Sequence, residues 1–169
     1  TVDSTTYTTT STYNSAGRLA TVAYPSTNTT VTYNYNTKGY LTSVTDGASL
    51  AYWTANAYDA ELHLTQSTAG NGVVTSKVYN ANTGRISTIK SGPGDSVQDL
   101  SFDFNTLGNL IERIDAVAQV TDTMDYDDLN RLTEVVTSNP SLPLNVTKTV
   151  AYDAIGNITN KSDVGDYTY

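Results

Sequence analysis

The chain has 169 residues, with 17 acidic side chains against 9 basic ones, a formal net charge of −8 and no cysteine. This composition excludes disulfides, thiol catalysis and cysteine-based zinc sites, and so acidic a chain is repelled by the phosphates of nucleic acids. We therefore expect no nucleic-acid binding. No apolar run approaches about 20 residues and no basic amphipathic stretch occurs, so we also expect no membrane insertion.

The 13 tyrosines and 30 threonines favour β-structure. One phrase recurs seven times: an aromatic residue, an Asn or Asp, a short turn, and a Leu or Ile. The copies begin at Tyr13, Tyr35, Tyr58, Tyr79, Phe104, Tyr126 and Tyr152. A period of 21 to 26 residues is typical of repeat proteins, whose units stack to build one surface. We expect residues 1–169 to form a single array, cut from a longer protein because the chain lacks an initial Met and ends within a copy.

Each copy predicts two antiparallel strands joined by a tight turn, beginning with the copy at residues 13–22. An Asn or Asp that opens a turn accepts a hydrogen bond from a backbone N–H two residues on. A Gly in the fourth position supplies the positive φ of a type I turn with a G1 bulge. The predicted structural turn residues are Asn14, Gly17, Asn36, Gly39, Asp59, Asn80, Gly84, Asn105, Gly108, Asp127, Asn130, Asp153 and Gly156.

Two features of the copies do not fit the prediction that every copy is the same β-hairpin. In the third copy Leu62 takes the glycine position, and since Leu is costly at positive φ we expect that turn to differ in type or length. The Leu-x-x-Val spacing after the turns, as in Leu19 and Val22, also fits one face of a helix. Helices of one turn are unstable alone, so we expect these segments to be strands.

Stated as a pattern, the unit is Y-[DN]-x-x-G-[RN]-[LI], and the segment YDAIGNITNKSDVGDYTY begins at Tyr152. It resembles the YD repeat of the Rhs family, which is shared by bacterial Rhs polymorphic toxins, the BC components of insecticidal toxin complexes and animal teneurins. The resemblance extends from Tyr13 to the end of the chain. It implies an all-β array of antiparallel hairpins whose curved, spiralling sheet is part of a hollow shell around a C-terminal toxin or cargo domain.

The same resemblance implies that the partners are the rest of the parent shell and its cargo, and that the protein is secreted or lies at the cell surface. Complete members end their shell at a DPxGL-type segment where self-cleavage releases the cargo, and this stretch does not occur here. No catalytic residue is therefore carried over, and we expect no enzyme activity, no cofactor and no metal.

Two features of the sequence are candidate sites. The acidic run with Asp122, Asp125, Asp127 and Asp128 lacks the order of an EF-hand loop and favours a solvated turn over a Ca²⁺ site. His63 has no second histidine or cysteine for a catalytic arrangement and stands where sister copies have Arg.

Those arginines, Arg18, Arg85 and Arg131, are expected to form a ladder with acidic side chains of adjacent copies, such as Glu112 or Glu134.

The alternative function is a cell-surface module that binds carbohydrate or protein, with Tyr52 and Trp53 as possible ligand-binding residues. A solvent-facing Trp53 beside Tyr52 would favour it, and a buried Trp53 would not. A hydrolase ranks well behind both functions. Open sheet edges seek partners, so we also expect edge-to-edge self-association or ends covered by the termini.

Overall fold

The computed structural model describes residues 4, 6–25, 29–47 and 50–169, and these residues are nearly all β-structure. Within these residues fifteen strands follow one another, with one turn of 3-10 helix, η1 (Pro93–Asp95), between the eighth and the ninth. By its contacts the chain forms two compact units, Thr1–Lys77 and Val78–Tyr169, each of which is described by itself.

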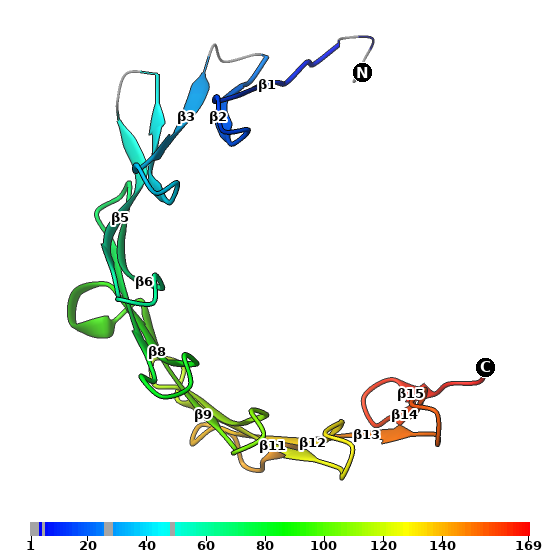
Figure 1. Ribbon diagram of the computed structural model, residues 1–169. Helices are drawn as coiled ribbons and strands as arrows, with labels where there is room; N and C mark the ends of the chain where they lie inside the picture. The colour runs from blue at the N-terminus through cyan, green and yellow to red at the C-terminus, as the bar shows by residue number, and fades with distance from the viewer. Residues whose placement is uncertain (1–3, 5, 26–28, 48–49) are drawn as a thin grey trace. The chain divides into compact units, whose positions relative to one another are not determined.

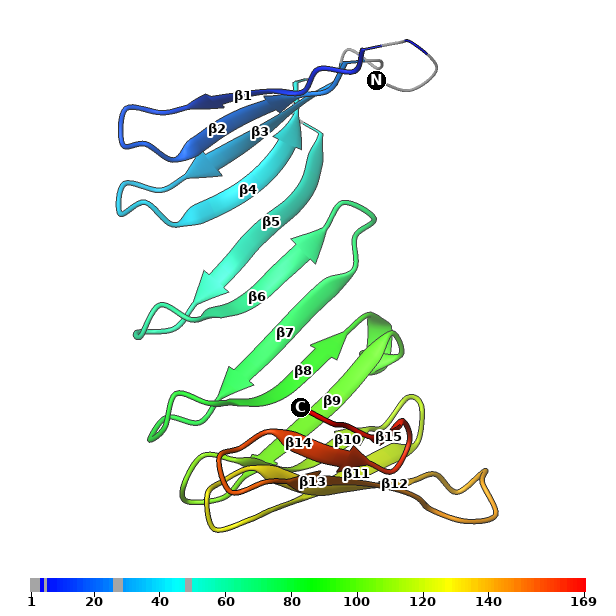
Figure 2. The ribbon, with the colours of Figure 1, turned by 90° about the vertical axis from the view of Figure 1, so that its right-hand side faces the viewer.

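The first unit is a meander in which each strand pairs antiparallel with the strand before and after it (Figures 1 and 2). Its strands are β1 (Thr10–Tyr13), β2 (Leu19–Ala23), β3 (Thr30–Tyr35), β4 (Leu41–Asp46), β5 (Ala51–Tyr58), β6 (Leu64–Ala69) and β7 (Val74–Tyr79), the last of which ends within the second unit.

The second unit repeats this arrangement. It comprises β8 (Ile86–Ser91), β9 (Gln98–Phe104), β10 (Leu110–Asp115), β11 (Val120–Tyr126), β12 (Leu132–Ser138), β13 (Val146–Tyr152), β14 (Ile158–Lys161) and β15 (Gly165–Asp166). Neighbours in sequence are again antiparallel partners. The predicted all-β array of antiparallel hairpins is therefore confirmed, and the Leu-x-x-Val segments lie on strands, not on helices.

The two faces of each sheet differ in chemistry. Val44 lies opposite Tyr33 on one side and Trp53 on the other, whereas Thr32 lies opposite Thr21 and Thr45. Directly paired residues share a face, so aromatic and aliphatic side chains gather on one face and threonines on the other. In the second unit the aromatic residue of each repeat likewise pairs with Leu110, Leu132 or Ile158. We call these the aromatic face and the opposite face.

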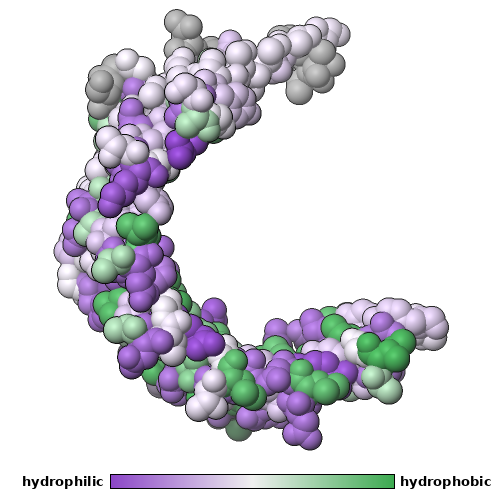
Figure 3. Space-filling view, in the orientation of Figure 1, coloured by the Kyte–Doolittle hydropathy of each residue, from purple (hydrophilic) through white to green (hydrophobic). Residues whose placement is uncertain are grey.

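The sheet is a single layer without a conventional core. Among the described residues no hydrophobic side chain is fully buried, and the aliphatic residues of the strands are mostly half-buried. Figure 3 shows hydrophobic side chains as small separate patches between hydrophilic ones. Stability must therefore come largely from the hydrogen-bonded ladders and from contacts between neighbouring repeats. In the described part of the chain no helix is long and apolar enough to cross a membrane.

Candidate functional site

The turns at one edge of each unit are built around the Asn or Asp that follows the aromatic residue. Asn14 Oδ1 accepts hydrogen bonds from the backbone N–H groups of Ala16 and Arg18, both at 3.0 Å. The same two bonds, to the second and fourth residues on, recur at Asn36, Asp59, Asn105, Asp127 and Asp153. Asn80, whose turn is one residue longer, accepts from Asn82 and Thr83.

The third turn does not differ from the others, contrary to the expectation from Leu62. Leu62 adopts φ 69° and its N–H donates to the Asp59 carbonyl, as the glycine N–H does in sister turns. This conformation costs roughly 1–2 kcal/mol for a residue with a Cβ. The bonds to the Asp59 side chain hold the turn in place, and the irregularity appears instead as an extra register shift in the β5–β6 ladder.

Tyrosine hydroxyls join each repeat to the one before it. The Tyr35 hydroxyl donates to the Leu19 carbonyl at 2.9 Å, and the Tyr58 hydroxyl donates to the Leu41 carbonyl at 2.6 Å. In the second unit Tyr126 reaches the Leu110 carbonyl at 2.8 Å and Tyr152 the Leu132 carbonyl at 2.9 Å. The last paired residues of β2 and β3 toward this edge are Thr21 and Thr32, so the Tyr35 hydroxyl bridges backbones beyond the end of the ladder. Sequence reasoning missed this role of the tyrosines.

The arginines after the turns lie over the aromatic ring of the next repeat. The Cζ atoms of Arg18, Arg85 and Arg131 lie 6.0, 5.9 and 4.6 Å from the ring centroids of Tyr35, Phe104 and Tyr152. Such cation–π contacts stabilise by about 0.5–1 kcal/mol at exposed sites. The predicted ladder between arginines and acidic side chains of adjacent copies is therefore wrong. Arg131 does pair with an acid, but with Asp127 of its own turn, at 2.7 Å.

The same residue position also contacts the turn of the next repeat. A Cβ on Gly39 would lie 2.1 Å from Arg18 Nη2, and one on Gly108 would lie 2.1 Å from Arg85 Nη2. Where Asn109 replaces Arg, the next turn has Asn130 in place of Gly, and Asn109 Nδ2 donates to Asn130 Oδ1 at 2.8 Å. Glycine in two of these turns thus serves positive φ and leaves room for a guanidinium as well.

His63 is a turn residue bonded to its own repeat. Its Nδ1 lies 2.9 Å from Asp59 Oδ2, and both side chains are about one-third exposed. Partial desolvation raises the pKa of the Asp59 carboxyl, but hydrogen bonds from the His63 side chain and backbone outweigh it and leave the pKa below its ordinary value. The pair is the histidine counterpart of Asp127 with Arg131, where the Arg131 N–H and guanidinium lower the pKa of Asp127.

The acidic residues of β11 lie in different environments, one buried and one exposed. Asp122, 6% exposed, accepts hydrogen bonds from the Arg113 guanidinium and from the Thr137 hydroxyl on neighbouring strands. Asp125 is exposed on the opposite face, directly across from Glu134. Among the described residues no three acidic or histidine side chains are placed to hold a metal ion. Asp122 is therefore a paired, buried carboxylate and not the solvated acid expected.

The two residues proposed for ligand binding differ in exposure. Tyr52 is 42% exposed, whereas Trp53 is half-buried on the aromatic face across from Val44. A register shift between Val44 and Thr45 leaves Tyr52 as the extra residue, and its carbonyl accepts from the Gly70 N–H at 2.7 Å. The structure thus brings one aromatic side chain to solvent here, not the exposed pair that sugar stacking would favour.

These features define a repeat protein of antiparallel β-hairpins whose turns, hydroxyls and cations connect each repeat to the next. No protein family and no curated protein sequence matches the chain. Solved structures that share its fold include components of a Tc toxin, so the expected likeness to toxin-complex components is confirmed at the level of fold.

The matched segment of a Photorhabdus luminescens Tc holotoxin pore with a TccC3 mutation is 24% identical, with a TM-score of 0.73 over 95% of this chain and 9% of that chain. A TcdB2-TccC3-TEV crystal structure gives 22% identity and the same TM-score and coverage. TcdB2-TccC3 without its hypervariable C-terminal region gives 18% and 0.61 over 91% of this chain. The chain therefore spans about a tenth of the chains it matches.

Proposed function

We propose that residues 1–169 are one continuous wall segment of an Rhs-type β-shell, a non-enzymatic scaffold that encloses a C-terminal toxin or cargo domain of a secreted or cell-surface protein. The observation that carries this proposal is the match of 95% of the chain to a segment of a Tc toxin at a TM-score of 0.73. The partners are the remaining repeats of the parent shell and its cargo.

The architecture suits a wall better than a site. A single layer joined by backbone ladders, hydroxyl bonds and turn-to-turn contacts suits a continuous barrier. The first strand is open to a further strand: all of β1 is exposed, and Tyr13 is 66% exposed and, among the described residues, makes no carbonyl contact like that of Tyr35. A further repeat, or a second copy of the chain, would supply that carbonyl.

The opposite face of the second unit gives the wall a charge. Asp103 pairs across strands with Glu112, and Asp125 pairs with Glu134. Directly opposed like charges destabilise a sheet, and no basic side chain neutralises these four within the described residues. We propose that this face lines the interior and holds a cationic payload loosely. A structure of the parent shell with these carboxylates on the outer surface would refute that clause.

The test of encapsulation starts with the coding sequence on both sides of the chain and then uses the full-length product. We expect further repeats followed by a dissimilar C-terminal domain, and that domain should resist limited proteolysis until the repeats are unfolded. The same domain produced alone, as the control, should be digested readily. A frame that ends in a wall or membrane anchor without a cargo, or a cargo digested equally in both forms, would overturn the proposal.

The exposed side chain of Tyr52 keeps adhesion as a second candidate. A glycan-array signal lost in Tyr52→Ala would favour it, with Trp53→Ala as the matched neighbour on the same strand. A clean array would count against it.

A further inference from the structure

Phe104 interrupts the row of tyrosine hydroxyls. In four other repeats the hydroxyl of the equivalent tyrosine donates to the carbonyl of the Leu in the preceding repeat. Phenylalanine has no hydroxyl, so the equivalent carbonyl, that of Ile86, loses this donor. The paired residues of β8 and β9 nearest this edge are Thr88 and Ser101, so the backbones beyond them remain open where Phe104 lies.

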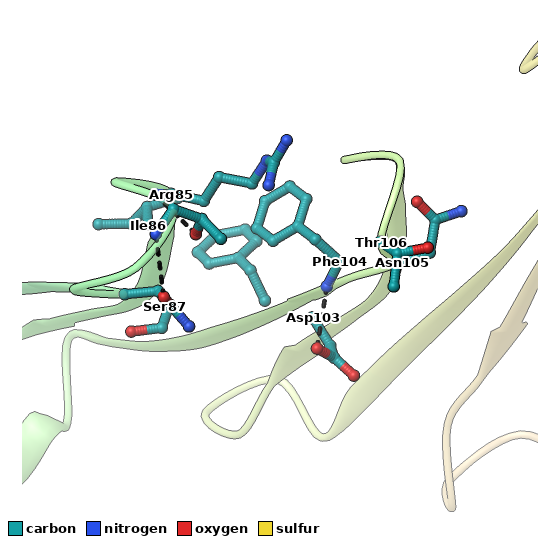
Figure 4. A pocket seen from close by; sticks show the side chains of 10 residues that line it. Arg85, Ile86, Ser87, Asp103, Phe104, Asn105 and Thr106 are labelled. Carbon is teal, nitrogen blue, oxygen red and sulfur yellow. Dashed lines mark hydrogen bonds between the residues drawn. The ribbon is translucent and has the colours of Figure 1, made fainter.

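A cavity of about 330 Å³ occupies this position. It is lined by Ile86 and Ser87 of β8, by Phe102, Asp103 and Phe104 of β9, and by residues of the two flanking turns, among them Arg85. Figure 4 shows the Arg85 side chain reaching over Phe104, while Asp103 points to the other side of the strand. All of these residues belong to the second unit, and the volume falls within the lower range of small-molecule pockets.

The cavity also contains a cation, Arg85, that makes no ion pair with the one carboxylate residue of the lining, Asp103. Arg131 is neutralised by Asp127 of its own turn, but the turn that precedes Arg85 opens with Asn80, which carries no charge. No acidic side chain lies within ion-pair distance of Arg85 in the part of the chain that the structure describes. Its guanidinium lies 5.9 Å from the Phe104 ring centroid and is half-buried. A carboxylate there would gain charge-assisted hydrogen bonds.

We propose that the cavity beside Phe104 binds a small carboxylate with an aromatic body and a hydrogen-bond donor. The carboxylate pairs with Arg85, the ring lies against Phe102 and Phe104, and the donor reaches the Ile86 carbonyl in place of the missing tyrosine hydroxyl. This site is independent of the scaffold function, because it depends on one repeat and not on a closed shell.

The probe that tests this site is 4-hydroxyphenylacetate, titrated into the ¹⁵N-labelled 169-residue chain and followed by NMR. A ligand of this size is expected to bind with a dissociation constant on the order of 1 mM, with shift changes concentrated at residues 80–106. Phenylacetate, which lacks the donor, and 4-hydroxyphenylacetamide, which lacks the charge, should each bind at least about 5-fold more weakly. These two probes leave the protein unchanged.

Phe104→Tyr supplies the hydroxyl from the protein and should weaken binding of 4-hydroxyphenylacetate by roughly 10-fold or more, as should Arg85→Gln. Tyr126→Phe is the matched control: it opens the same gap at Leu110, but Asn109 replaces the arginine there, so no second site should appear. Equal affinity for the three probes, unchanged binding in Phe104→Tyr, or no shifts at residues 80–106 up to about 20 mM would overturn the proposal.

Discussion

Removing one hydroxyl from the tyrosine row should weaken the sheet, and adding the missing one should strengthen it. Tyr126→Phe deletes the donor to the Leu110 carbonyl, a 2.8 Å bond made by a ring whose partial desolvation raises the pKa of its hydroxyl. A net hydrogen bond contributes about 0.5–1.5 kcal/mol, and a carbonyl left without a partner raises the cost to as much as about 3 kcal/mol. We expect Tyr126→Phe to lower the free energy of unfolding by about 1 kcal/mol, because water can reach this edge of the sheet and bind the carbonyl.

Phe104→Tyr is the reverse experiment in the next hairpin along the sheet and should add about 0.5–1.5 kcal/mol. The assay is urea unfolding of the 169-residue chain, together with amide hydrogen exchange on β8 to β11, since repeat arrays can unfold in parts. Tyr52→Phe, whose side chain is 42% exposed, is the control and should stay within about 0.5 kcal/mol. If Tyr126→Phe costs no more than this control and Phe104→Tyr brings no gain, the hydroxyl row does not stabilise the sheet.

Three further outcomes follow from the geometry. Gly39→Ala and Gly17→Ala both place a Cβ at positive φ, but only the Cβ at position 39 would meet Arg18. In urea unfolding, Gly39→Ala should therefore lower the free energy of unfolding by about 0.5–1 kcal/mol more than Gly17→Ala does. This difference should vanish in an Arg18→Ala background. Asp122→Ala removes the hydrogen bonds that Asp122 accepts from the two neighbouring strands, so the free energy of unfolding in the same assay should fall by about 1–3 kcal/mol. The same substitution at an exposed acid of that strand should be near neutral. Asp127 has a lowered pKa, so its contribution is complete above the ordinary value of 3.8 and is lost as the pH falls through the lower folded-state value; Asp127→Asn should flatten the acid limb of stability against pH, and an unchanged limb would contradict this.

The hairpins could be predicted because their determinants are local. An Asn or Asp followed three residues later by Gly contains the acceptor and the positive φ that the turn needs, and alternation assigns the faces of each strand. Leu62 shows where local preference misleads. Two hydrogen bonds to Asp59 fix the turn and outweigh the strain at one residue. Conformational preference is assigned to one residue at a time, whereas the conformation of the turn depends on all of its hydrogen bonds together.

Contacts between repeats could not be predicted in the same way. The arginines looked suited to acidic side chains of adjacent repeats, but what they contact there is the aromatic ring of the next repeat, one hairpin along the sheet. The hydroxyl bonds span 16 to 20 residues, so their acceptors are invisible without the register. One signal was present in the sequence: of the seven copies, the one that begins at Phe104 alone opens with an aromatic residue that lacks a hydroxyl. That substitution marks the cavity.

A sheet without a buried core must distribute its stability along its length. Each repeat contributes its own turn bonds and its backbone ladders, and the repeats of Tyr35, Tyr58, Tyr126 and Tyr152 add one hydroxyl bond to the preceding repeat, so nearest-neighbour terms dominate. Loss of one term therefore weakens one junction and leaves distant ones intact. Between β8 and β9 the hydroxyl bond is missing because residue 104 is Phe, and Arg85 connects the two repeats at that edge through the Phe104 ring and the turn that contains Gly108. The junction that lacks the hydroxyl also opens a cavity, so occupancy of that cavity should raise the protection of β8 and β9 against hydrogen exchange more than that of strand pairs far from it.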